Sequence, residues 1–145
     1  MDSNTKREII LDNYSNPFNK TSEGVDGYIY VNSNNESCID NIDLYIKIED
    51  EIITDLKFDG EACAISTAST SIMIKNMLGK SIDEVVSYIT NFEAMLNEEE
   101  YEDKGFNEAQ VFDETYKQGN RKTCVTLPYT GIKKAIMKYK EDANK

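Results

Sequence analysis

Three cysteines are the residues of this chain best suited to chemistry, and the sequence contains no histidine. They are Cys38, Cys63 and Cys124. The lack of imidazole excludes a cysteine nucleophile activated by histidine, because that pair needs the ring nitrogen as its base. Thiolates and carboxylates remain available, and together they bind soft metal ions. The residue types therefore favour a metal–thiolate site.

Each cysteine is expected at a boundary between predicted elements. Alternating apolar residues predict a strand over 42–48 and a hairpin partner over 52–58, after a first strand at 28–31. Cys38 precedes the second strand, Cys63 follows the hairpin and opens a helix, and Cys124 lies near the start of the last helical region. Boundaries at one end of a sheet can converge in space. A helix N-terminus would also stabilise the thiolate of Cys63.

The remaining pattern places helices after the strands. A capping box at 5–8 predicts a helix over 5–14, and helical spacing predicts further helices. Residues 97–105 are expected to form an acidic loop, and Pro128 should kink or interrupt the last helix. This order predicts an α+β fold, with a small three-stranded antiparallel sheet packed with helices, in one domain over 1–145. The further helices are expected over 63–78, 81–96, 107–118 and 121–140.

A fourth ligand is available beside the first cysteine. Asp40 lies two residues after Cys38, and side chains at this spacing face the same side of an extended chain. Three thiolates and one carboxylate suit tetrahedral zinc, and the thiolates also suit iron–sulfur chemistry. Two alternatives stay open on the residues alone. Free cysteines often fill core space, and Asp40 could be a turn or cap residue.

Composition excludes several classes of partner. With 16 basic and 27 acidic residues, the net charge is -11. Binding to nucleic acid or to anionic membranes is therefore not expected, since both need clustered basic residues. We see neither a signal peptide nor the ~20 apolar residues of a membrane helix. A cytoplasmic protein with reduced thiols is expected, and an odd number of cysteines argues against a disulfide framework.

The segments around all three cysteines carry a family resemblance. Residues 60–69, Gly-Glu-Ala-Cys-Ala-Ile-Ser-Thr-Ala-Ser, are similar to the Gly-x-Gly-Cys-x-Ile-Ser-x-Ala-Ser segment of the IscU/SufU (NifU N-terminal-like) iron–sulfur cluster assembly family. Residues 37–40 resemble its Cys-Gly-Asp loop, 121–127 its third-cysteine helix, and 9–17 its N-terminal helix. Thr123 stands where IscU-type scaffolds have histidine, their Leu-Pro-Pro-Val-Lys segment is missing, and the second and third cysteines are far apart. The chain thus resembles the SufU branch.

The resemblance implies a function and a site. It implies zinc bound by Cys38, Asp40, Cys63 and Cys124, and a SufS-type, pyridoxal-phosphate-dependent cysteine desulfurase as partner. Cys38 would accept persulfide sulfur, so the protein would act as a sulfurtransferase partner rather than as a stand-alone enzyme. A scaffold for [2Fe-2S] cluster assembly and transfer is the alternative, and a zinc-stabilised interaction module is the third hypothesis. Ile39, Ala62 and Pro128 depart from the family pattern but leave the four ligands intact.

Overall fold

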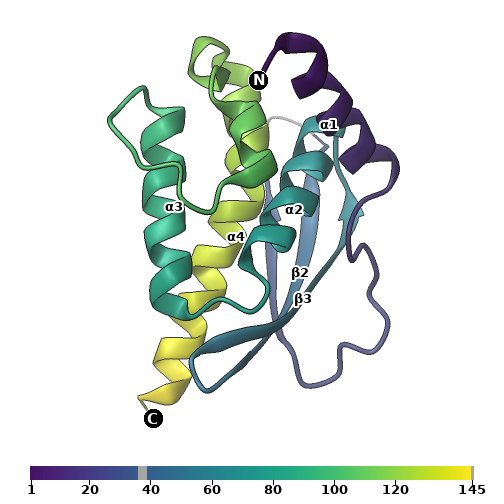
Figure 1. The fold of residues 1–145 in the computed structure, drawn as a ribbon. Coiled ribbons are helices and arrows are strands. Elements are labelled where there is room, and N and C mark those ends of the chain that lie inside the picture. The colour runs from purple at the N-terminus through teal and green to yellow at the C-terminus, as the bar shows by residue number, and fades with distance from the viewer. Residues whose placement is uncertain (36–38, 145) are drawn as a thin grey trace.

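A three-stranded antiparallel sheet forms one layer of the molecule (Figure 1). The computed structural model describes residues 1–35 and 39–144. Of the apolar positions that alternate along the middle strand, Ile42, Leu44 and Ile46 are buried, as their spacing predicted, and Ile48 is partly buried. A two-residue turn at Asp50 and Glu51, both with positive φ, joins the second and third strands. The strands follow the order β1 (Ile29–Asn34), β2 (Asn41–Glu49), β3 (Ile52–Glu61).

Helices cover one side of this sheet and confirm the predicted α+β class (Figure 1). The fourth helix contacts β1 and β2, and the second helix lies beside it. The first helix packs on the second, and the third packs on the fourth. None of the described helices is long and apolar enough to cross a membrane. The elements are α1 (Ser3–Ser15), α2 (Ala64–Met77), α3 (Ile82–Leu96), α4 (Gly119–Ala143) and two 3-10 helices, η1 (Asn107–Phe112) and η2 (Thr115–Lys117).

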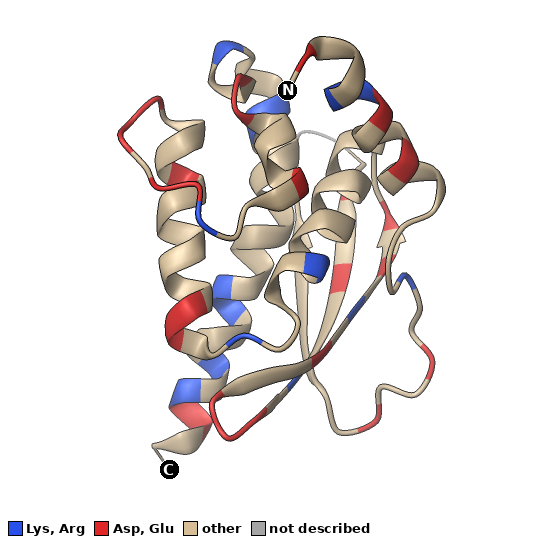
Figure 2. Ribbon diagram, viewed as in Figure 1, with Lys and Arg blue, Asp and Glu red and all other residues tan. Residues whose placement is uncertain are grey.

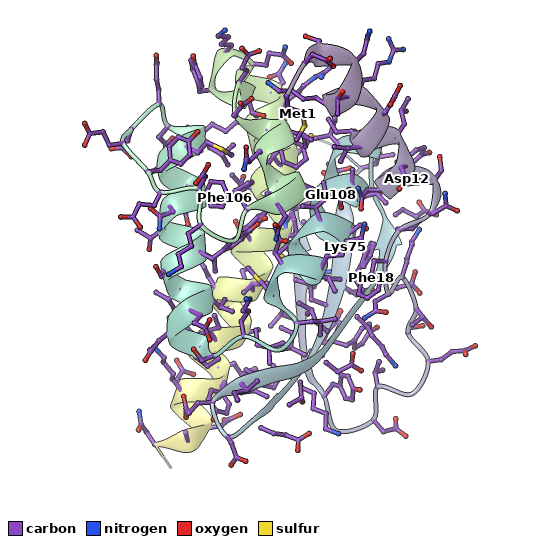
Figure 3. The ribbon with its side chains drawn as sticks, in the orientation of Figure 1. Met1, Asp12, Phe18, Lys75, Phe106 and Glu108 are labelled. Carbon is purple, nitrogen blue, oxygen red and sulfur yellow. The ribbon has the colours of Figure 1, made fainter. Side chains whose placement is uncertain are left out.

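An aromatic cluster fills the core between α3, α4 and the segment before η1. Figure 3 labels one of its members, Phe106, beside α3. We define the cluster as Tyr88, Phe92, Phe106 and Tyr129, and all four side chains are buried. The rings of Phe92 and Tyr129 stack with their centroids 4.3 Å apart, and Phe106 meets Phe92 edge-on. Offset and edge-on contacts of this kind add to the stability that burial alone provides.

Pro128 was expected to kink or interrupt the last helix, and the interruption does not occur: α4 runs unbroken from residue 119 to 143. Proline has no N–H to donate, so the carbonyl of Cys124 one turn earlier loses its usual helical partner. The hydroxyl of Ser66 lies 3.0 Å from that carbonyl oxygen and can replace the missing donor. Ser69 likewise donates to the carbonyl of Val125 at 2.7 Å. Ser66 thus offers the carbonyl of Cys124 a replacement donor, and both serines join α2 to α4.

Three smaller expectations also differ from the structure. The helix predicted over 107–118 is two short 3-10 helices, separated by a turn at residues 113–114. The first helix is capped by Asp2, which accepts from the backbone N–H of Thr5, rather than by a box at 5–8. The third strand continues past Phe58 to Glu61. This last difference matters for the site, because the extra residues lead directly to Cys63.

Candidate metal site

The β2–β3 hairpin brings Asp40 and Cys63 together. In its antiparallel register Asn41, the first residue of β2, pairs with Glu61, the last residue of β3. Asp40 directly precedes Asn41, and Ala62 and Cys63 directly follow Glu61. Residues that lie far apart in sequence therefore become neighbours at one end of the sheet, as expected.

Gly60 allows the two strands to close at this end. Its φ of +114° lies in a region that side chains rarely permit. A Cβ atom there would stand 2.2 Å from the backbone oxygen of Asn41, which is a direct clash. Glycine is required at this position, and it fixes the approach of Cys63 to the start of β2.

Cys63 is the N-cap of α2, as the sequence predicted. Its thiol sulfur accepts from the backbone N–H of Ser66 at 3.4 Å. Its own backbone N–H donates to Asp40 Oδ1 at 2.6 Å, and its sulfur lies 3.5 Å from Asp40 Oδ2. The carboxylate of Asp40 is 2% exposed. Asp40 is thus held by the first turn of α2 rather than being a simple turn residue.

Cys124 reaches the same place from α4. One ligand atom each from Asp40, Cys63 and Cys124 lies within 4.8 Å of the other two. Both cysteines are partly exposed and free of disulfides. The structure therefore brings together three of the four predicted ligands, and we call them the Asp-Cys-Cys cluster. The fourth, Cys38, lies outside the described residues.

The electrostatics of this cluster disfavour further negative charge. The pKa of the Cys124 thiol is raised to about 12. Burial is the main cause, followed by the neighbouring thiol of Cys63 and the carboxylate of Asp40. Three groups that can each lose a proton therefore share one small volume. A bound cation would reverse this balance, because positive charge favours the deprotonated thiol.

The donor set fits a thiophilic divalent ion. Sulfur and carboxylate oxygen are both zinc ligands, and the spread of the three donor atoms is compatible with one shared centre. The thiolates would equally suit an iron–sulfur cluster. Ile39, which replaces the glycine of the family loop, is 79% exposed, so its larger side chain takes no space from the cluster.

Ser66 is a site residue to which sequence reasoning gave no role. Its hydroxyl is fully buried and lies 2.7 Å from Asp40 Oδ2, so its single proton is shared between this oxygen and the carbonyl of Cys124. The hydroxyl oxygen of Ser66 also lies 3.5 Å from the sulfur of Cys63. Partners of this kind orient metal ligands and fix their direction. The signal was a serine three residues after the capping cysteine, in the first turn of the helix.

The fold and site define a class: a small α+β protein with thiols and a buried carboxylate gathered at one end of an antiparallel hairpin. The family described as "NifU-like N terminal domain" matches residues 5–145. The chain belongs to this family, whose IscU and SufU members take part in iron–sulfur cluster assembly.

Named relatives lie on both branches of the family. The chain is 36% identical to the zinc-dependent sulfurtransferase SufU of Bacillus subtilis, over 91% of this chain and 89% of that protein. It is 31% identical to the iron–sulfur cluster assembly scaffold protein IscU of Thermotoga maritima, over 90% and 92% of the two chains. A solved structure described as a putative SUF-system scaffold, from Fervidobacterium islandicum, has a TM-score of 0.78 at 27% identity, covering 91% of this chain and 97% of its own.

Proposed function

We propose that this protein, through one domain over residues 1–145, is a zinc-dependent sulfur acceptor that works with a SufS-type cysteine desulfurase. Its metal ligands are Cys38, Asp40, Cys63 and Cys124. The observation that supports this proposal is the Asp-Cys-Cys cluster, whose donor atoms lie within 4.8 Å of one another. A relative of similar length named as a zinc-dependent sulfurtransferase adds to it.

The proposed transfer is a thiol–disulfide exchange. The thiolate of Cys38 attacks the outer sulfur of the desulfurase persulfide, a new S–S bond forms on Cys38, and the donor cysteine leaves as a thiolate. Zinc, when bound, supplies positive charge that keeps the ligating thiols deprotonated. Cys63 and Cys124 hold the site, while Asp40 is oriented by the backbone of Cys63 and by the Ser66 hydroxyl.

Persulfide transfer can be tested directly. The zinc-loaded protein is mixed with the desulfurase and free cysteine, and cysteine turnover and the mass of each cysteine peptide are measured. Turnover should rise, and a gain of one sulfur should appear on Cys38. Cys38→Ser should bind the desulfurase without accepting sulfur. Unchanged turnover in the presence of the zinc-loaded wild type would contradict the proposal.

A scaffold for a [2Fe-2S] cluster is the second candidate function. It is supported by the relatives named as scaffolds and by two thiols within one ligand set. Anaerobic incubation with iron and sulfide should then give a coloured protein that passes its cluster to an apo-acceptor. If zinc cannot be displaced by iron and sulfide, this candidate fails while sulfur acceptance remains possible.

A further inference from the structure

A cleft of about 600 Å³ lies next to the Asp-Cys-Cys cluster. Its walls come from α1, the first turn of α2, the η1–η2 segment and the first turns of α4. Half of its lining residues are apolar, among them Ile10, Ile65 and Phe112. Both arginines of the chain, Arg7 and Arg121, line this cleft. We call it the arginine cleft.

Arg7 and Arg121 are the unpaired charges of the cleft. Lys6 also lines it but is bonded to Asp113, and Glu114 lies within ion-pair distance of Lys117. Among residues 1–35 and 39–144, no ion pair or hydrogen bond engages the side chain of either arginine. Figure 2 shows the basic residues of α1 at the same end of the molecule as those of η2 and the start of α4. The cleft is thus locally cationic in a chain of net charge -11.

The cleft adjoins the cysteines along the chain. Ala64 and Ile65 directly follow Cys63. On α4, Arg121 lies one helical turn before Cys124, and Val125 directly follows it. Any molecule seated in the cleft is therefore held beside the cluster, at the N-terminal ends of both helices.

We propose that the arginine cleft receives an acidic surface segment, bearing at least one apolar side chain, of the protein that donates sulfur. Unpaired guanidinium groups complement carboxylates and can bind them through two parallel hydrogen bonds. The apolar lining residues complement the apolar side chain, and arginine with buried apolar anchors is typical of interface centres. This inference rests on the proposed function, because the donor is the desulfurase. It adds the chemistry by which that donor is recognised.

Affinity for the desulfurase is the deciding measurement. The full-length, zinc-loaded protein is titrated against immobilised desulfurase as wild type, Arg7→Glu, Arg121→Glu and the two corresponding Gln variants. Lys140→Glu is the matched control, since it reverses an exposed charge at the far end of α4. Each Glu variant should bind about tenfold more weakly or worse, and the Gln variants should fall between, as expected for an interfacial charge pair. The control should stay within about twofold of wild type.

Each alternative result has a defined meaning. If both Arg→Glu variants bind like Lys140→Glu, the proposal is overturned. Concentration-dependent self-association that the same variants abolish would assign the cleft to a second copy of this chain, and would also overturn it. Zinc content is measured in every preparation; if Arg121→Glu loses zinc, Arg7→Glu, on α1, decides. A wild type that neither binds nor stimulates the desulfurase would remove the proposed function itself, which separates that failure from the failure of the cleft.

Discussion

Two polar groupings in this molecule are built in opposite ways. In the aromatic cluster, the Asn76 amide donates to the hydroxyl of Tyr88 at 2.9 Å, and the hydroxyls of Tyr88 and Tyr129 lie 3.0 Å apart. Burial raises the pKa of both tyrosines, so they remain neutral and every polar atom finds a neutral partner. In the Asp-Cys-Cys cluster, acidic groups face each other and the cysteines are partly exposed.

The difference separates stability from reactivity. A neutral, fully satisfied network stabilises a core at little electrostatic cost. A cluster of acidic groups is costly to ionise unless a cation compensates it, and perturbed groups of this kind are typical of functional sites. We therefore expect the aromatic cluster to control the free energy of unfolding and the Asp-Cys-Cys cluster to control metal affinity. A substitution in one cluster should have little effect on the quantity that the other controls.

The largest effect should come from the aromatic cluster. Phe92→Ala removes a fully buried ring that contacts Tyr88, Phe106 and Tyr129. It should lower the free energy of unfolding by about 3–5 kcal/mol, measured by urea titration of the metal-free protein. Zinc affinity at a temperature where the variant is folded should stay within about threefold of wild type. A large loss of zinc affinity would show that the two regions are coupled after all.

The second prediction concerns the Asp-Cys-Cys cluster, where a substitution should change zinc affinity strongly and stability little. Cys124→Ser should lower zinc affinity by more than about 100-fold, because the loss of a residue that only supports a ligand already costs about 10–100-fold. The unfolding free energy of the metal-free variant should change by about 1 kcal/mol or less, since the side chain is small and partly exposed. Competition with a chromophoric chelator measures the first quantity and urea titration the second. Unchanged zinc affinity would remove Cys124 from the ligand set.

A matched pair of serines sharpens the comparison. Ser66→Ala removes the hydroxyl beside Asp40 and should lower zinc affinity about tenfold or more. Ser69→Ala lies one turn further along α2 and removes a buried hydrogen bond to Val125 instead. Each should cost about 1 kcal/mol of stability. Only Ser66→Ala should change zinc binding, in the same competition assay; equal effects of the two would reduce Ser66 to a link between helices.

The sequence predicted the class of fold and the proximity of three candidate ligands because local patterns carried both. Alternation along β2 and the capping position of Cys63 are short-range signals that tertiary packing did not override. The interruption expected at Pro128 does not occur, and the hydroxyl facing the carbonyl that lacks its helical donor belongs to Ser66, about sixty residues earlier in the chain; no local pattern reveals such a contact. The arginine cleft was missed for the same reason: Arg7 and Arg121 line one cleft only because α1 and α4 both pack on α2.

The smallest effect concerns pH in the metal-free protein. The pKa of the Cys124 thiol is about 12 in the folded state, against an ordinary value of 9.0. Between these two values the unfolded chain binds fewer protons than the folded one, so stability must fall as pH rises. Stability from this thiol is complete below about pH 9 and is lost as pH approaches 12.

Urea midpoints of the metal-free wild type should decline from pH 8 to pH 10, although lysines and tyrosines contribute to that decline. Cys124→Ala keeps those groups and removes the thiol, so its decline should be shallower. Parallel declines would mean that the cluster is not as crowded with acidic groups as its geometry indicates.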